Sequence, residues 1–145
     1  SRSKEGKLVT HSDPISDLLI RIKNAGNRSH ISTKIPHFNF GESILSVLKS
    51  EGWIVGYKVI GEKQPGKFLI VNLKYTISDS GDRIPLIQNL KRISKPSRRV
   101  YLKKDEVKKV LNGLGTGLIS TPQGLLPDRE AQKKGLGGEY VAVIT

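Results

Sequence analysis

The chain has 145 residues, of which 25 are Lys or Arg and 13 are Asp or Glu, so its formal net charge is +12. This excess favours a polyanionic partner, nucleic acid before an anionic membrane or an acidic protein, because Lys and Arg release condensed counterions on binding phosphates. The chain has no cysteine, which excludes disulfides, thiolate metal sites and cysteine nucleophiles. No run of 18 apolar residues occurs, so we expect no transmembrane helix and no membrane partner.

The first half is predicted to be an α-β-α-β-β lobe over residues 11–77, preceded by an N-terminal arm over residues 1–10. Asp13 can cap a helix that begins at Pro14, and apolar residues then follow at helical spacing: Ile15, Leu18, Leu19 and Ile22. The other predicted elements are a strand over 32–35, a helix that ends near Gly52, and β-rich segments over 53–60 and 68–75.

The second half is predicted to be a mostly β lobe over residues 86–145. Residues 78–85 are the candidate linker, because Ser, Asp and Gly fill their first five positions. The predicted strands cover 90–94, 98–102, 114–120, 124–126 and 139–144, and the predicted short helices cover 105–110 and 128–134. The sequence therefore indicates an α+β protein with two small lobes.

A basic stretch opens this second half, with nine cations in nineteen residues: Lys91, Arg92, Lys95, Arg98, Arg99, Lys103, Lys104, Lys108 and Lys109. Only Asp105 and Glu106 oppose them. Lysines can protect a strand edge, but that needs fewer cations, so we favour a surface that follows phosphates. Tyr101 lies inside the stretch and can either stack on a base or pack in the core.

Three glycines spaced by two, Gly113, Gly115 and Gly117, raise the question of a nucleotide-binding loop. Such a loop needs its glycines after a strand and at the start of a helix, so that the helix N-terminus faces phosphate. Here the glycines precede a predicted strand, and no Gly-Lys-Ser or Gly-Lys-Thr follows. We therefore favour close backbone packing or a bulge within a sheet.

The segment Ser120-Thr121-Pro122-Gln123-Gly124 is the candidate for specific recognition. Two hydroxyls and an amide can read base edges and 2′-hydroxyls without a charge, and glycine lets a backbone approach RNA closely. Taken alone, the segment is more typical of an ordinary Ser-Thr turn. Glu139, which follows Gly137 and Gly138, can accept from a base amino group, orient nearby side chains or cap a turn.

Catalysis is not predicted. His11, His30 and His37 all lie in the N-terminal third without metal-ligand spacing, and none is near Ser120 in the sequence. The carboxylates are scattered over helix-start and turn positions. We expect no enzyme, metal, cofactor or small-molecule substrate. A DNA-binding protein and a small hydrolase that uses Ser120 are the alternatives, although neither a helix-turn-helix nor a dimerising heptad supports the first.

Several motifs, in order, resemble the bacterial-type family of the eighth protein of the small ribosomal subunit, from about residue 13 to residue 144. They include Asp-Pro-Ile-Ser-Asp-Leu-Leu-Ile-Arg-Ile-Lys-Asn-Ala at 13–25 and Leu-Lys-Ser-Glu-Gly-Trp-Ile at 48–54. The most specific is Ile-Ser-Lys-Pro-Ser-Arg-Arg-Val-Tyr at 93–101. Four shorter ones follow: Gly113-Leu114-Gly115, Ile119-Ser120-Thr121, Asp128-Arg129-Glu130-Ala131 and Gly137-Gly138-Glu139.

The resemblance implies a two-lobe α+β fold that binds the central domain of small-subunit ribosomal RNA early in assembly, beside neighbouring ribosomal proteins. It implies a ribosome in the bacterial cytoplasm or in an organelle, and some members also repress their own operon's mRNA. The resemblance assigns the main RNA contact to Ser120, Thr121 and Gly124. The other expected RNA-binding residues are Gln123, Tyr101, Ser94, Lys95, Pro96, Arg98, Arg99, Lys91, Arg92, Gly137, Gly138, Glu139, Arg21, Lys23 and Asn24.

Three features depart from the family pattern. The family often has Ser-Thr-Ser-Lys-Gly at the turn, whereas this chain has Pro122 and Gln123 in the middle, so it lacks one hydroxyl, one cation and one backbone donor. Gln123 can still form hydrogen bonds. The last helix usually begins with a hydroxyl cap, near which Pro127 stands here, and the arm before Thr10 is longer than the family leads us to expect.

Overall fold

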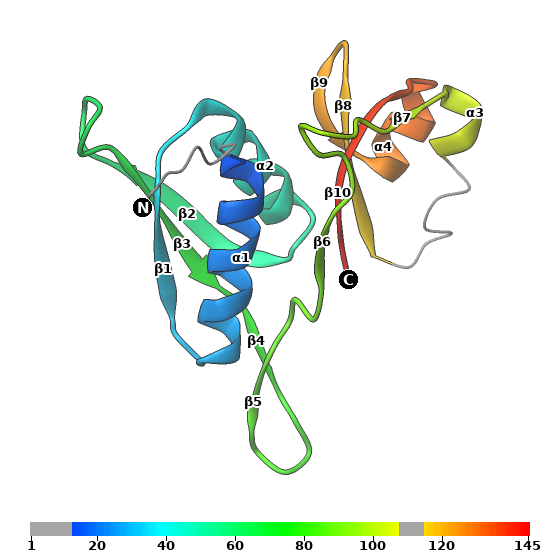
Figure 1. Cartoon of the computed structure of the whole chain (residues 1–145). Helices are drawn as coiled ribbons and strands as arrows, with labels where there is room; N and C mark the ends of the chain where they lie inside the picture. Colours follow the sequence, from blue (N-terminus) through cyan, green and yellow to red (C-terminus); the bar gives the residue numbers. More distant parts are fainter. Residues whose placement is uncertain (1–12, 108–114) are drawn as a thin grey trace.

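The computed structural model describes residues 13–107 and 115–145 (Figure 1). The predicted arm and four residues of the predicted motifs lie outside this range: Lys108, Lys109, Gly113 and Leu114. The first half is a three-stranded antiparallel sheet of order β1-β3-β2, with two helices packed on one of its faces. Its elements are α1 (Pro14–Asn27), β1 (Ser32–Pro36), α2 (Asn39–Ser50), β2 (Ile54–Ile60) and β3 (Phe68–Leu73).

The start of α1 follows the prediction. Asp13 is the N-cap and its carboxylate accepts hydrogen bonds from the Ser16 backbone N–H and hydroxyl, while Pro14 takes the first helical position. Leu18 and Ile22 on the predicted apolar face are buried against the sheet. The helix therefore arises from a local cap and a local apolar period.

Between the two halves lies a two-stranded hairpin, β4 (Tyr75–Ile77) and β5 (Arg83–Pro85), which projects from the body in Figure 1. The Tyr75 hydroxyl donates to the His30 carbonyl oxygen at 2.5 Å, and Arg83 donates to the Ser29 carbonyl oxygen and lies over the Tyr75 ring. Residues 78–85, predicted as a linker, are thus the turn and second strand of this hairpin.

The second half is built on one antiparallel sheet of order β6-β10-β8-β9, with β7 also paired to β10. Its elements are β6 (Leu90–Arg92), β7 (Tyr101–Leu102), α3 (Lys104–Val107), β8 (Thr116–Thr121), β9 (Gly124–Pro127), α4 (Asp128–Lys134) and β10 (Gly138–Ile144). The α+β class is confirmed, and α4 has the predicted bounds, with Gly135 as its left-handed C-cap.

Two predicted elements of this half are corrected. The strand expected over 98–102 is reduced to β7, because residues 95–98 form a tight turn instead. The helix expected over 105–110 begins at Lys104 and is described as far as Val107; residues 108–110 lie outside the described chain.

The two halves share their largest buried cluster. Leu118 and Ile144 of the second sheet pack with core residues of the first half, such as Leu45 and Val71. A smaller cluster, which includes Val107, Ile119, Ala131 and Tyr140, lies on the other side of the second sheet. One buried cluster spans both halves and therefore fixes the position of one half relative to the other. The predicted division into two lobes stays a prediction.

Candidate nucleic-acid interface

A polar row crosses the second sheet next to the shared core. Leu125, Ser120, Glu139 and Tyr101 are successive partners across β9, β8, β10 and β7. Cross-strand partners lie on one face of a sheet, so these four side chains share a face. Ser120 is two residues beyond the buried Leu118, so this face changes from core to surface at the row.

The exposure of Tyr101 answers a question that the sequence left open. Its side chain is 69% exposed, so it is available to stack rather than part of the core.

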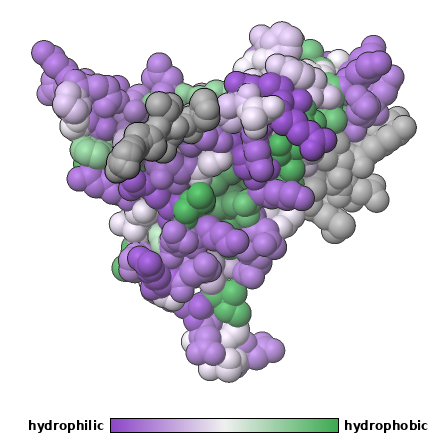
Figure 2. Space-filling view, viewed as in Figure 1, coloured by the Kyte–Doolittle hydropathy of each residue, from purple (hydrophilic) through white to green (hydrophobic). Residues whose placement is uncertain are grey.

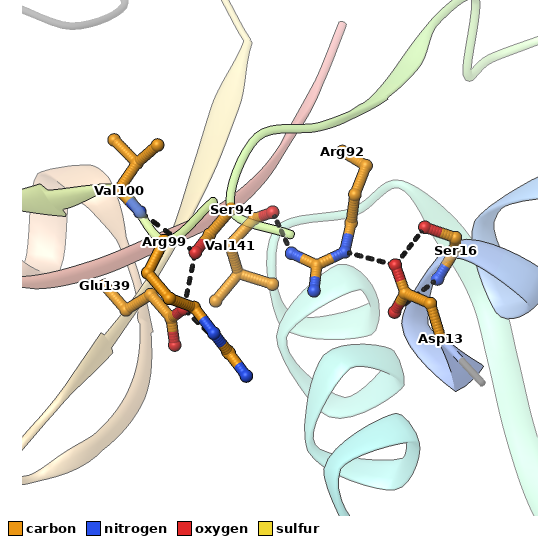
Figure 3. Close-up of polar contacts among 8 residues, drawn as sticks. All are labelled: Asp13, Ser16, Arg92, Ser94, Arg99, Val100, Glu139 and Val141. Atoms are coloured by element: carbon orange, nitrogen blue, oxygen red, sulfur yellow. Dashed lines mark hydrogen bonds and ion pairs between the residues drawn. The ribbon is translucent and has the colours of Figure 1, made fainter. Parts of the chain in front are cut away.

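Glu139 is the centre of the row, and its carboxylate is already bound within the protein (Figure 3). Its Oε2 accepts hydrogen bonds from the Ser94 hydroxyl at 2.5 Å and from Arg99 Nη1 at 2.9 Å. Burial acts to raise the pKa of Glu139, but these hydrogen bonds and the charge of Arg99 outweigh it and lower the pKa below its ordinary value. The carboxylate is therefore charged at neutral pH and orients Arg99. Orienting a nearby side chain is one of the three roles that the sequence left open for Glu139.

Ser94, a predicted RNA contact, is fully buried. Its hydroxyl donates to Glu139 and accepts from the Val100 backbone N–H at 3.1 Å. It thereby ties the loop before β7 to β10. This geometry favours an indirect role, in which Ser94 supports Glu139 and Arg99 rather than meeting RNA itself.

The predicted recognition turn is a tight hairpin between β8 and β9, closed by the Thr121 side chain. Thr121 Oγ1 donates to the Gly124 carbonyl oxygen at 2.8 Å and accepts from the Gln123 backbone N–H at 3.0 Å. Gly124 has φ +104°, which favours glycine. Pro122, Gln123 and Gly124 are exposed, whereas Thr121 is buried. The Thr121 hydroxyl thus fixes the turn that presents its neighbours.

The basic stretch folds into a second tight turn, over residues 95–98. Lys95 and Arg98 exchange two backbone hydrogen bonds of 2.8 and 2.9 Å, and Pro96 is exposed at the tip. Beside this turn is a groove of about 320 Å³, lined by Lys91, Arg92, Ile93, Lys95, Arg98 and Val100. Four of its six lining residues are cations, so the groove suits an anion such as a phosphate.

Arg92 is a structural cation within this groove, because only 9% of its side chain is exposed. Its Nε pairs with Asp13 Oδ2 at 3.3 Å, and its Nη1 donates to the Val141 carbonyl oxygen at 2.8 Å (Figure 3). Burial acts to raise the pKa of Asp13, but hydrogen bonds from Ser16 and the charge of Arg92 outweigh it, so the pKa is lowered. Arg92 therefore joins the cap of α1 to β10.

The α1 residues predicted to meet RNA lie on the exposed side of that helix. Arg21 is partly occupied, because it pairs with Asp17 at 3.0 Å and also donates to the Lys34 carbonyl oxygen at 3.3 Å. Lys23 and Asn24 are exposed. Lys23 also lines a groove between α1 and β6 that shares Arg92 with the basic groove; its other lining residues are Ser16, Leu19, Ile20 and Leu90. Figure 2 shows apolar surface in this central region, where α1 and β6 lie side by side.

Gly137 and Gly138 serve close backbone packing. A Cβ at Gly138 would lie 2.1 Å from the Ser120 carbonyl oxygen, and one at Gly137 would lie 2.4 Å from that of Leu102. Both distances are too short for a side chain, so the pair lets β10 enter the sheet beside the recognition turn.

Sequence reasoning missed the two internal ion pairs of this region. Asp13 and Arg92 are 79 residues apart, and Arg99 and Glu139 are 40 residues apart. No short-range pattern indicates either pair. Among residues 13–107 and 115–145, no group of three or more His, Cys, Asp or Glu side chains could hold a metal ion. No described helix is long and apolar enough to cross a membrane.

Comparison with known proteins points to one family. A family model described as "Ribosomal protein S8" matches residues 13–145. Relatives named "Small ribosomal subunit protein uS8" include one from Mycoplasmopsis synoviae, 48% identical over 132 residues, which are 91% of this chain and 96% of the relative. Another from Dictyoglomus thermophilum is 44% identical over 136 residues, which are 94% of this chain and 99% of that relative. A third, from Streptococcus pyogenes serotype M49, is 47% identical over 132 residues, covering 91% and 96%.

Proposed function

The chain belongs to the ribosomal protein S8 family, and from this premise we propose that it binds the central domain of small-subunit ribosomal RNA directly and supports early assembly of the subunit. As a member of this family it has a structural role in the ribosome and is not an enzyme. The observation that carries the proposal is the polar row, in which Ser120 and Tyr101 stand on either side of a carboxylate that holds Arg99.

The interface divides into two kinds of contact. Lys91, Lys95 and Arg98 are exposed at the basic groove and supply affinity for phosphates of any sequence. Tyr101, Arg99 and the recognition turn supply a fixed arrangement of an aromatic ring, a cation and neutral polar groups. Such a surface suits an irregular RNA helix, whose unstacked bases can be stacked and hydrogen-bonded.

Other predicted residues act indirectly in this proposal. Ser94 and Arg92 hold the loop before β7 and the edge strand β6, and Gly137 with Gly138 allows β10 to approach the turn. Lys23 and Asn24 of α1 extend the cationic and polar surface past β6. A cytoplasmic bacterial ribosome and repression of the operon's own mRNA through a similar RNA shape belong to the same proposal.

Substitution of Thr121 tests the role of the recognition turn. Thr121→Val removes both hydrogen bonds that close the turn while nearly keeping its volume, so affinity for a central-domain rRNA fragment should fall by about 1–3 kcal/mol. Thr121→Ser keeps the hydroxyl and should retain most of the affinity. Filter binding measures both variants.

Equal affinity of the Val variant and the unchanged protein would remove the turn from the interface. Duplex DNA of matched length serves as competitor in the same assay. If it displaced the rRNA fragment as well as unlabelled fragment does, the protein would be a general nucleic-acid binder and the proposal would fail.

A further inference from the structure

In the part of the chain that the structure describes, helices cover only one face of the three-stranded sheet of the first half. Ile35, Leu69 and Val71 point to the helices and are buried. The alternate positions therefore point to the opposite face, which no described element of the protein covers (Figure 1). The register places them in three cross-strand rows: Pro36, Phe68 and Ile60; Lys34, Ile70 and Lys58; Ser32, Asn72 and Gly56. We call these nine residues the open sheet face.

The centre of the open sheet face is apolar. Outward positions of a solvated antiparallel strand are usually polar, yet the central strand β3 places Phe68 and Ile70 there, both only partly buried. Ile60 beside them is 38% exposed. Val55, at the irregularity where β2 meets β3, is 63% exposed at the margin. A contiguous apolar area of this kind marks an interaction surface more often than scattered single residues do.

Cations flank this apolar centre, and the nine residues include no carboxylate. Lys34 and Lys58 lie on either side of Ile70 in the middle row, two strand spacings or about 10 Å apart. Lys34 Nζ lies 4.1 Å from the centre of the Phe68 ring. Within residues 13–107 and 115–145, neither lysine forms an ion pair. The face is thus complementary to an apolar surface with negative charge at its margins.

The same features favour a protein over RNA as the occupant. Protein interfaces have an apolar centre with charges at the rim, whereas RNA-binding sheets leave aromatic rings free to stack on bases. Here Lys34 covers the one aromatic ring, that of Phe68, and the other apolar residues of the face, Ile60, Ile70 and Pro36, are not aromatic. The polar row of the second sheet has the opposite composition, with its Tyr101 ring exposed.

We infer that the open sheet face is a docking surface for a neighbouring protein of the small subunit, one that presents an apolar patch flanked by carboxylates. This inference rests on the proposed place of the chain in the subunit. It adds which surface meets protein there and assigns the two sheets to different kinds of partner.

The absence of cysteine permits a direct test on the full chain. Ile60→Cys places a thiol on the open sheet face, and Gln123→Cys places one at the exposed recognition turn. Alkylation by N-ethylmaleimide is timed for the free protein, for its complex with naked small-subunit rRNA, and for small subunits reconstituted with all other proteins. Val55→Cys provides a second probe of the same face.

The thiol of Ile60→Cys should react equally fast in the first two states and at least about tenfold more slowly in the complete subunit, because a protein interface excludes the reagent. The thiol of Gln123→Cys should already be protected by rRNA alone, which reports the proposed RNA contact separately. Protection of Ile60→Cys and Val55→Cys by naked rRNA would make RNA the occupant. Equal reactivity in all three states would show an open face. Either result overturns the inference.

Discussion

The two sheets expose surfaces that are organised in opposite ways. On the second sheet the one charged member of the polar row, Glu139, is already bound within the protein: it holds Arg99 beside the row and accepts a hydrogen bond from the buried Ser94. On the first sheet the centre of the open sheet face is apolar, and within the described chain the two lysines of that face have no carboxylate partner.

This difference indicates how one small protein can meet two kinds of partner. A polar surface gains specificity when its groups are fixed before binding, since less rotamer freedom is then lost in the complex. An apolar face needs no such fixing, because removal of its area from water is favourable without directed bonds. We therefore expect changes at the polar row to alter RNA affinity and changes at the open sheet face to leave it unaltered.

The largest expected effect concerns the core that holds both sheets in one frame. Leu118 is fully buried in the cluster shared by the two halves, so Leu118→Ala should reduce the free energy of unfolding by about 2–5 kcal/mol. Trp53, the only tryptophan, lies in the first half and donates to Thr116 of the second at 2.8 Å. Its fluorescence and far-UV circular dichroism should shift together in urea.

The control for this prediction is Ile119→Ala, which truncates one side chain of the smaller cluster on the other side of the same strand. Ile119→Ala should reduce the free energy of unfolding by a similar amount, and its fluorescence and circular dichroism transitions should coincide. If the fluorescence transition of Leu118→Ala stayed where it is in the unchanged protein while the dichroism transition moved, the halves would unfold separately. The two surfaces would then not share one frame.

A smaller effect is expected from Glu139→Gln. The amide keeps an acceptor for Ser94 but loses the charge that holds Arg99, so the free energy of unfolding at pH 7 should fall by less than in Leu118→Ala, because Arg99 is exposed and water screens the ion pair. The pKa of Glu139 is lowered in the folded protein. Its contribution is therefore complete above the ordinary pKa of 4.5 and is lost as the pH falls through the folded value.

Denaturation midpoints measured from pH 7 to pH 3 should thus differ between the two proteins at neutral pH and converge in acid. The rRNA affinity of the variant should also fall, because Arg99 is no longer oriented. A constant difference at every pH would show that the charge of Glu139 has no part in the network.

The elements that could be predicted from sequence are those with local signals. Asp13 and Pro14 mark the start of α1, and Gly135 ends α4 at the predicted residue. The hairpin β4–β5 was not predicted, because Ser, Asp and Gly are equally typical of a linker and of a hairpin turn. The strand expected over 98–102 is shorter in the structure, because its first residue, Arg98, instead pairs with Lys95 in the tight turn.

The sequence indicated candidate residues for the site, whose part in RNA binding stays a prediction, but it did not indicate all the contacts among them. Ser120 to Gly124 has the composition of a turn, and a turn is what forms. The Thr121 hydroxyl closes this turn through local hydrogen bonds to Gln123 and Gly124, which fits the ordinary Ser-Thr turn that the sequence also indicated. That Ser94 is buried beneath Glu139, in contrast, depends on strand register and on a contact across 45 residues of chain. Register is fixed by the packing of both faces of the sheet, which no local pattern states.

The smallest expected effect is also the sharpest test of the comparison, because it contrasts two exposed cations. Arg98 lies at the basic groove, and Lys58 lies on the open sheet face. If Arg98 neutralises one phosphate, Arg98→Ala should lower the slope of log affinity against log salt by about 0.9. Lys58→Ala removes a charge of the same sign and should leave that slope unchanged, since a general loss of positive field would affect both variants alike. Filter binding to the rRNA fragment over a potassium chloride series measures both slopes. Equal losses of slope would mean that the two sheets meet RNA together, and the distinction between a polar RNA surface and an apolar protein surface would no longer hold.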